Sequence, residues 1–312
     1  MQRRGVVLVN DLLLLLTAVI WGVAFVAQRA GMEHVGPFTY NAVRFALGSL
    51  ALLPLIAFRG RAGRRPAPAV PAMPTSRPIG AIRAGLIAGA ILVFGASLQQ
   101  IGLVYTTAGK AGFVTGLYVV LVPLSGLFWK QKTEWSAWTG AVLCLAGLFL
   151  LSVTSAFTVE RGDLIVLAGS FFWAAHVQVV GWLSPRTDPV KLACVQFALC
   201  SVVSAAAALV LEQPRLPSIL QAAAPILYGG ILSVGVAYTL QVVAQQHAPP
   251  SHAAILLSLE SVFAALGGAV ILGERLGTRG TVGCVLMFAG MMASQLPALA
   301  SRSASARPAG PR

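Results

Sequence analysis

The sequence has 312 residues, of which 57% are apolar and only 10% are charged, and its formal net charge is +13. Soluble globular domains carry about a quarter charged residues, so this composition excludes an ordinary soluble protein. The basic residues lie between long apolar runs rather than on an amphipathic face, which excludes nucleic acid as the expected partner. The composition indicates an integral membrane protein whose surroundings are the lipid bilayer.

Apolar runs long enough to cross a membrane recur along the chain. A helix needs about 20 apolar residues to span the hydrocarbon core, and Gly, Pro and charged residues separate the runs. The ten runs cover residues 8–30, 37–58, 79–103, 108–129, 135–155, 162–182, 189–211, 219–243, 251–272 and 278–298. We therefore expect an all-α protein with ten transmembrane helices, a basic Pro-rich loop at 59–78 and a disordered tail at 299–312.

The distribution of basic residues predicts the orientation of these helices. With ten spans, fifteen of the 22 Lys and Arg residues fall on the side of the N-terminus, six fall on the opposite side, and Arg44 lies within a span. Cytoplasmic segments of membrane proteins carry the excess of Lys and Arg. We therefore expect a multi-pass protein of a bacterial-type inner membrane with both termini in the cytoplasm.

The second half of the sequence repeats the first half. At an offset of 152 residues, Asp11 aligns with Asp163 and Trp21 with Trp173. At an offset of 142, Gln99 aligns with Gln241. The change of offset falls on the basic loop, where the first half is longer. Matches of Asp, Trp and Gln carry more information than matches of Leu and Ala in such a composition.

The repeat length predicts an inverted architecture. Each repeat contains five spans, and because five is odd, the second repeat runs in the opposite direction across the membrane. We expect the first repeat at 1–155 and the second at 156–298. Inverted repeats allow a central site to open alternately to either side, so this feature indicates a transporter.

The order of several short motifs resembles the EamA-type, ten-helix branch of the drug/metabolite transporter superfamily. The motifs run from Asn10-Asp11-Leu12 through the stretch 99–109 to Leu259-Glu260 and Gly273-Glu274, and the resemblance covers about residues 10–296. It implies a small-molecule permease, with efflux as the commoner role. The chain departs from the family at Ser261, where the family usually has the proline that kinks the ninth span.

Two charged residues within spans are the principal candidates for the site. Glu260 lies near the middle of the ninth span, where a charged side chain costs about 2.5–3.5 kcal/mol and is expected to face the bundle interior. A carboxyl group there can bind a proton or a substrate ammonium. Arg44 lies at a similar depth in the second span, so the two residues either pair directly or flank one substrate that carries both charges. Alternatively, Arg44 extends toward the outer interface.

Six further side chains are candidates for the path, and a structural role is the alternative for each. Tyr118 occupies the repeat position of Glu260. Gln99 and Gln241 either contact the substrate or form interhelical hydrogen bonds. His176 is a proton relay or an ordinary core histidine. The candidate substrate-binding or proton-binding residues are Glu260, Arg44, Tyr118, Gln99, Gln241, Trp21, Trp173 and His176.

Charged and titratable residues at the expected span ends are assigned to the membrane interface. Lys110 and His252 are repeat mates at the starts of spans four and nine, where capping or contact with the interface is the ordinary role. Asp11 and Asp163 are expected to cap or begin spans one and six.

The sequence contains no motif for membrane enzymes or ATP hydrolysis. It has no intramembrane Asp pair, no His-Glu-x-x-His and no phosphate loop, so we expect no enzyme activity, no cofactor and no metal. The predicted function is secondary active transport of a small metabolite or drug-like molecule by alternating access, with proton coupling as a hypothesis. A flippase for a lipid-linked intermediate, a membrane enzyme and a channel are the alternatives. The sequence is compatible with a monomer or a homodimer.

Overall fold

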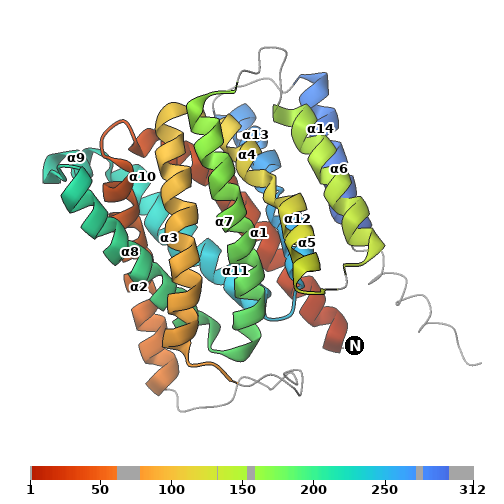
Figure 1. Cartoon of the computed structure of the whole chain (residues 1–312), viewed down its shortest axis with the longest axis horizontal. Helices are drawn as coiled ribbons and strands as arrows, with labels where there is room; N and C mark the ends of the chain where they lie inside the picture. The colour runs from red at the N-terminus through yellow and green to blue at the C-terminus, as the bar shows by residue number, and fades with distance from the viewer. Residues whose placement is uncertain (1, 62–77, 132, 153–158, 272–276, 295–312) are drawn as a thin grey trace, which may run out of the picture.

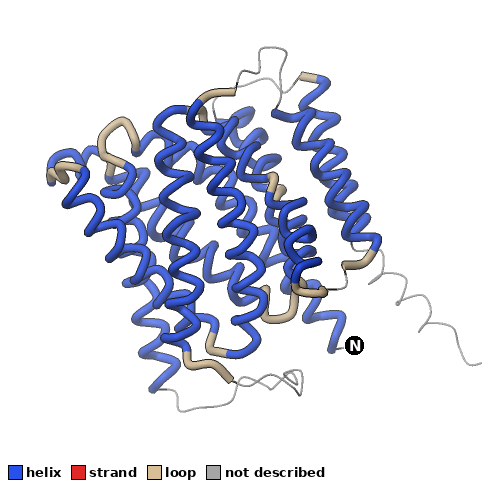
Figure 2. Tube along the Cα trace, viewed as in Figure 1, coloured by secondary structure: helices blue, strands red, loops and turns tan. Residues whose placement is uncertain are grey.

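The computed structural model describes residues 2–61, 78–131, 133–152, 159–271 and 277–294, and within these residues every regular element is helical (Figures 1 and 2). The first half contains α1 (Gln2–Gly31), α2 (Pro37–Arg61), α3 (Ala81–Tyr105), α4 (Ala108–Gly116), α5 (Tyr118–Phe128) and α6 (Trp135–Ser152). The second half contains α7 (Arg161–Leu183), η1 (Ser184–Arg186), α8 (Pro189–Leu211), α9 (Leu216–Gln221), α10 (Ala223–Leu227), η2 (Tyr228–Tyr238), α11 (Thr239–Ala244), α12 (Pro250–Leu257), α13 (Glu260–Ile271) and α14 (Thr278–Ser294).

The helices fit the expected membrane spans. Seven helical segments are long and apolar enough to cross a bilayer: 5–31, 37–60, 81–105, 108–128, 161–186, 189–211 and 223–244. Two shorter apolar helices cover 135–151 and 250–266, and α14 takes the place of the tenth span. The predicted tail at 299–312, most of the predicted loop at 59–78 and the predicted repeat boundary at 155/156 lie outside the described residues.

Local sequence signals explain where many of the helices begin. Proline is the first residue of α2, α8 and α12, a position where its missing N–H leaves no hydrogen bond unmade. The Asp188 side chain caps α8 by accepting hydrogen bonds from the backbone N–H groups of Val190 and Lys191. Asp163 forms a capping box with Glu160 at the start of α7, as its expected capping role predicts. Its repeat mate Asp11 lies inside α1, so the expected capping role of Asp11 is wrong.

The packing of the helices repeats with an approximate twofold relation. Helix α2 packs against α8, and α6 packs against α14, so each of these pairs joins equivalent helices of the two halves (Figure 1). Helix α1 packs against η2, α11, α12 and α13, while α7 packs against the corresponding α3, α4 and α5. Exchange of the halves relates each of these packings to another of them, as the predicted inverted repeat requires.

Glycines allow the closest of these approaches. A Cβ atom added at Gly147 of α6 would lie 2.5 Å from the carbonyl oxygen of Gly283 in α14, and one added at Gly283 would lie 2.6 Å from the carbonyl oxygen of Gly147. Small residues at helix contacts let backbones approach closely in lipid, where dispersion forces hold helices together. The α6–α14 pair forms one edge of the bundle (Figure 1).

Spans four and nine are both interrupted, at equivalent positions. Helix α4 ends at Gly116 and α5 begins at Tyr118, while α12 ends at Leu257 and α13 begins at Glu260. The backbone N–H groups of Leu117 and Leu259 donate to carbonyl oxygens three residues earlier, so the helix tightens locally. The structure thus breaks the ninth span beside Glu260 although Ser261 stands where a proline was expected. Interrupted helices at the boundary of inverted repeats are a common setting for transport sites.

The eighth span departs from the symmetry. Residues Tyr228–Tyr238 form a π-helix, η2, whereas the corresponding residues 86–96 belong to the regular helix α3. Gly230 of η2 lies directly against α2, since a Cβ atom there would stand 3.0 Å from the carbonyl oxygen of Arg44. Departures from α-helical hydrogen bonding are frequent at functional sites.

Candidate functional site

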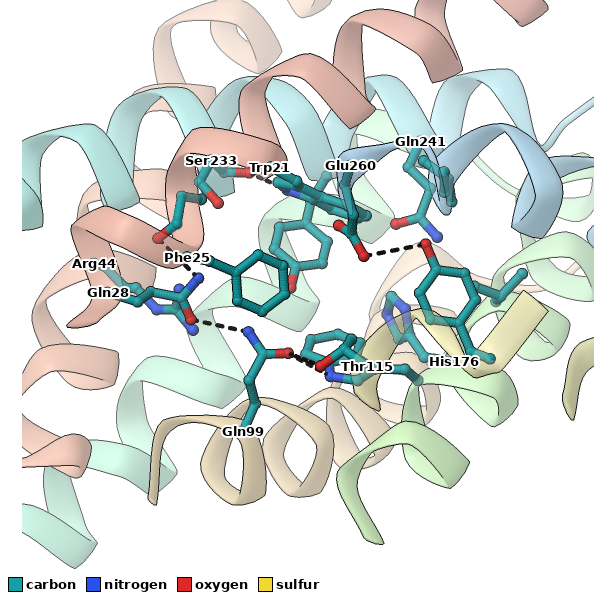
Figure 3. Close-up of a pocket in the computed structure, with 16 residues that line it drawn as sticks. Trp21, Phe25, Gln28, Arg44, Gln99, Thr115, His176, Ser233, Gln241 and Glu260 are labelled. Carbon is teal, nitrogen blue, oxygen red and sulfur yellow. Dashed lines mark hydrogen bonds between the residues drawn. The ribbon is translucent and has the colours of Figure 1, made fainter. Parts of the chain in front are cut away.

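A cavity lies between the two halves, and all eight predicted site residues line it (Figure 3). Arg44 and Gln28 lie at one end of the cavity in this view, and Glu260 and Gln241 lie at the other, with Phe25 between them. The complete lining is Trp21, Ala24, Phe25, Gln28, Arg44, Gln99, Thr115, Tyr118, Trp173, His176, Val177, Ser233, Tyr238, Gln241, Leu257 and Glu260. Residues separated by more than 200 positions in the sequence therefore converge on one space.

The two helix breaks place Tyr118 and Glu260 opposite each other. Each is the first residue of the second half-helix of its span, and each side chain is buried. The Tyr118 hydroxyl donates to Glu260 Oε1 at 3.4 Å, a long and weak hydrogen bond. Among the residues that the structure describes, the carboxyl group of Glu260 thus has one weak side-chain hydrogen bond and keeps capacity for a further partner.

Arg44 is fully buried, with 1% of its surface exposed, so it does not extend to the outer interface. Its Nε donates to Asn41 Oδ1 at 3.0 Å, and its guanidinium lies 5.3 Å from the Tyr40 ring centroid and 4.9 Å from that of Phe45. No ion pair joins Arg44 to Glu260 or to any other carboxylate in the described ranges. Of the two arrangements predicted for these charges, the direct pair is absent from this structure.

The repeat mates Gln99 and Gln241 occupy different environments. Gln99 lies at the centre of a hydrogen-bond network, because its Oε1 accepts from Trp173 Nε1 at 2.8 Å and its Nε2 donates to Gln28 Oε1 at 3.0 Å. Gln241 Nε2 donates to Gln245 Oε1 at 3.0 Å within its own segment. The amide oxygen of Gln241 is buried without a hydrogen-bond partner among the residues that the structure describes. The interhelical role fits Gln99, and the substrate-contacting role fits Gln241.

Trp21 and Trp173 flank the ring of Tyr238. Its ring centroid lies 4.5 Å from that of Trp21 and 6.0 Å from that of Trp173. The Trp21 indole N–H donates to the carbonyl oxygen of Ser233 at 3.3 Å. Because the two Trp residues come from equivalent helices, they form symmetric walls of the cavity, and Tyr238 stands between them.

His176 contacts the cavity from the middle of α7. Its Nε2 lies 3.0 Å from Gln196 Oε1, and its Nδ1 is buried without a hydrogen-bond partner in the described part of the chain. The same is true of Arg44 Nη2. With the amide oxygen of Gln241, three cavity-lining side chains hold polar atoms that the described residues leave unsatisfied. Because an unmet buried polar atom costs about 1–3 kcal/mol, such atoms are expected to bind water or a ligand.

Several residues of the lining were not predicted from the sequence. Helical spacing provides a signal for three of them: Gln28 lies seven residues after Trp21, Thr115 three before Tyr118, and Tyr238 three before Gln241. Residues three, four or seven apart lie on one face of a helix. The residues three, four or seven positions from each predicted residue therefore include Gln28, Thr115 and Tyr238.

Comparisons with known proteins agree with this architecture. The model of the EamA-like transporter family matches residues 8–153 and again residues 160–294. A relative named as an uncharacterized transporter of Archaeoglobus fulgidus is 31% identical over 265 residues, covering 85% of this chain and 78% of the relative. The uncharacterized inner membrane transporter YedA of Escherichia coli K12 is 26% identical over 161 residues, covering 50% of this chain and 48% of YedA.

A solved crystal structure shares the fold, with a TM-score of 0.75 and 18% identity, and the alignment covers 93% of this chain and 97% of that chain. The predicted family and the ten-helix membrane fold are confirmed. The matches support a multi-pass membrane transporter.

Proposed function

The chain belongs to the EamA-like transporter family, and from this premise we propose that it is a secondary active transporter that works by alternating access. The two repeats at 1–155 and 156–298 are the units that move relative to each other. The cavity between them holds the substrate near the middle of the membrane. Transport runs outward, and both termini lie in the cytoplasm, as the excess of Lys and Arg on that side predicts.

The main support for the proposal is that all eight predicted residues line one cavity. Two of them, Tyr118 and Glu260, lie at the helix breaks. In a carrier, such a site must bind its substrate without binding it too tightly. The partly satisfied atoms of Arg44, His176 and Gln241 offer hydrogen bonds that a substrate completes and releases. Glu260 binds a proton or a substrate cation, and Trp21, Trp173, Tyr118 and Gln99 shape the walls.

The separation of the two charges favours a substrate that carries both. Arg44 and Glu260 lie toward different ends of the cavity (Figure 3) and form no ion pair in the described residues. A small molecule with a cationic group for Glu260 and an anionic group for Arg44 Nη2, which has no hydrogen-bond partner in the described part of the chain, fits between them. The apolar ring of Phe25 and the two Trp residues contact the remainder of such a molecule.

Transport in proteoliposomes tests the proposal. Uptake, current and internal pH are measured with gradients of amino acids, organic cations and organic anions, for the unsubstituted protein, Glu260→Gln and Arg44→Gln. The matched control is Glu33→Gln, which changes an exposed glutamate between α1 and α2. We expect at least one compound to be transported, with loss of transport in Glu260→Gln and full transport in Glu33→Gln.

The double variant Glu260→Gln/Arg44→Gln tests the doubly charged substrate. Because both residues contact one molecule in the proposal, the second substitution is expected to reduce transport less in the double variant than it does as a single substitution. Strictly additive losses contradict a shared substrate. Full transport by folded Glu260→Gln contradicts the assigned role of the carboxyl group. Movement of lipid-linked compounds alone, with none of the small molecules transported, would favour the flippase.

A further inference from the structure

Two acid–base pairs join the halves of the protein at opposite ends of the bundle. In the first, Asp11 Oδ1 of α1 lies 2.8 Å from His252 Nε2 of α12; we call this the Asp11 pair. In the second, Asp163 Oδ2 of α7 lies 3.9 Å from Lys110 Nζ of α4, which also contacts Glu160 Oε1 at 2.6 Å; we call this the Asp163 pair. Each pair ties the first span of one repeat to the fourth span of the other.

The two pairs are equivalent under the exchange of halves. The offset of 152 relates Asp11 to Asp163, and the offset of 142 relates Lys110 to His252. Each acid contacts the base of the other repeat rather than the base of its own repeat. An acid–base contact between equivalent positions therefore occurs twice across the boundary between the repeats, closer in the Asp11 pair than in the Asp163 pair.

The cavity lies between the two pairs. Asp11 precedes Trp21 by ten residues and Asp163 precedes Trp173 by ten residues, so each acid lies about 15 Å along its helix from a cavity wall. Each base lies eight residues before the first residue of a second half-helix, Tyr118 or Glu260. Each pair therefore lies toward one end of the helices that line the cavity.

The burial of Asp11 and Asp163 links the state of each pair to the opening of its end of the bundle. Asp11 is 7% exposed and Asp163 is 4% exposed. A buried carboxylate that loses its partner is strongly disfavoured unless water replaces that partner. Separation of the Asp11 pair therefore requires water to enter its end of the bundle. Asp163 also accepts hydrogen bonds from the Thr106 hydroxyl at 2.5 Å and from the backbone N–H of Glu160 at 2.8 Å, so these contacts hold its carboxylate when Lys110 moves away. Formation of each pair stabilises the closed state of its end.

We propose that the Asp11 pair and the Asp163 pair are the two gates of the transport cycle. Their residues are positioning residues that control access to the cavity without contacting the substrate. This inference rests on the proposed alternating-access function and on its topology, in which the Asp11 pair closes the cytoplasmic end and the Asp163 pair closes the outer end. Both pairs are formed in this structure.

Side-specific labelling of the cavity tests the gates. The reporter is Ala24→Cys, a small residue of the lining, in a background in which the four native cysteines are replaced by alanine. Right-side-out and inside-out vesicles are treated with a membrane-impermeant maleimide. We expect Lys110→Ala to raise the labelling rate from outside about threefold and His252→Ala to raise it from the cytoplasmic side about threefold, which corresponds to a shift of about 0.6 kcal/mol.

Control variants separate gating from general loosening. Arg215→Ala and Lys191→Ala remove exposed basic residues near the outer and cytoplasmic ends, respectively, and are expected to leave both rates unchanged. His252→Lys keeps a base opposite Asp11, as in the other repeat, and is expected to keep the unsubstituted rates. The exchange Asp11→His/His252→Asp is expected to restore the rates that His252→Ala changes.

Opposite directions for the two alanine variants are the decisive result, because a merely structural role would loosen both ends alike. An increase in labelling from the same side in both variants, or no change in either variant, would contradict the proposed gating. A labelling rate in His252→Lys equal to that in His252→Ala would contradict a role for the contact between Asp11 and the base at position 252. The labelling uses no substrate, so it gives an answer even if the Glu260→Gln experiment rejects the proposed transport function.

Discussion

The different environments of the repeat mates Gln99 and Gln241 lead to opposite expectations for the same substitution. Gln99→Leu removes hydrogen bonds to Trp173 and Gln28 and leaves the indole N–H and an amide oxygen buried without partners. Hydrogen bonds between membrane helices are worth about 0.6 kcal/mol on average, and each stranded polar atom costs about 1–3 kcal/mol in proteins generally. We expect a loss of about 2 kcal/mol in the free energy of unfolding.

Gln241→Leu is expected to leave the free energy of unfolding nearly unchanged. It removes one hydrogen bond and leaves the buried amide oxygen of Gln245 without that partner, but it also removes the Gln241 amide oxygen, which has no partner in the described ranges. The loss and the gain are of similar size, so the net change is expected to stay below about 0.5 kcal/mol. Transport of a compound identified by the panel is expected to fall about tenfold, because the substrate loses a contact worth about 1.4 kcal/mol.

Reversible unfolding in mixed micelles and transport in proteoliposomes, measured on the same preparations, test both expectations. Gln99→Leu should lower stability more than Gln241→Leu, and Gln241→Leu should impair transport while it remains folded. Equal destabilisation by the two substitutions would refute the reasoning from unsatisfied atoms. Unimpaired transport by Gln241→Leu would contradict a contact between the substrate and the amide oxygen of Gln241.

Three further predictions concern packing and capping. Gly147→Val is expected to destabilise the α6–α14 pair by about 1–3 kcal/mol, as judged by unfolding, whereas Gly109→Ala, which has open space around it, should be neutral or slightly stabilising. Glu212→Ala is expected to lower the free energy of unfolding by about 1–2 kcal/mol, because the Glu212 carboxylate accepts three hydrogen bonds at the start of α2. Glu212→Gln should lower it less. Equal losses of stability in the two variants would contradict the capping role. Tyr238→Ala is expected to unfold more easily by about 3–5 kcal/mol, while Tyr238→Phe keeps the ring contacts and should retain stability.

The sequence predicted the fold well because the bilayer reduces the choice of structures. Ten apolar runs can only be helices, and the repeat of Asp, Trp and Gln at fixed offsets related the two halves. The same offsets placed Tyr118 at the repeat position of Glu260, and in the structure the two side chains are in contact. All eight candidate residues reached one cavity because polar side chains inside a membrane must turn toward the interior of the bundle.

Other features depended on contacts that local sequence does not reveal. The break beside Glu260 occurs without the proline that usually marks such a kink, and it depends on a tightened turn at Ser258 and Leu259. The π-helix η2 has no composition signal that distinguishes it from the regular helix α3. Lys110 and His252 were recognised as repeat mates at span ends, but the contact of each with an acid of the other repeat was not predicted.

The unequal eighth and third spans have a consequence for the resting state of the protein. Two identical inverted halves would make the inward-open and outward-open forms copies related by a twofold rotation, with equal free energy. Tyr238 at the end of η2 occupies the position of Ala96 in α3, so the halves are not interchangeable around the cavity. A free-energy difference of only about 1.4 kcal/mol between the two forms would populate one of them tenfold over the other. In the proposed alternating-access cycle, the bulky ring and the π-helix would therefore make the two forms unequal in free energy before any substrate binds.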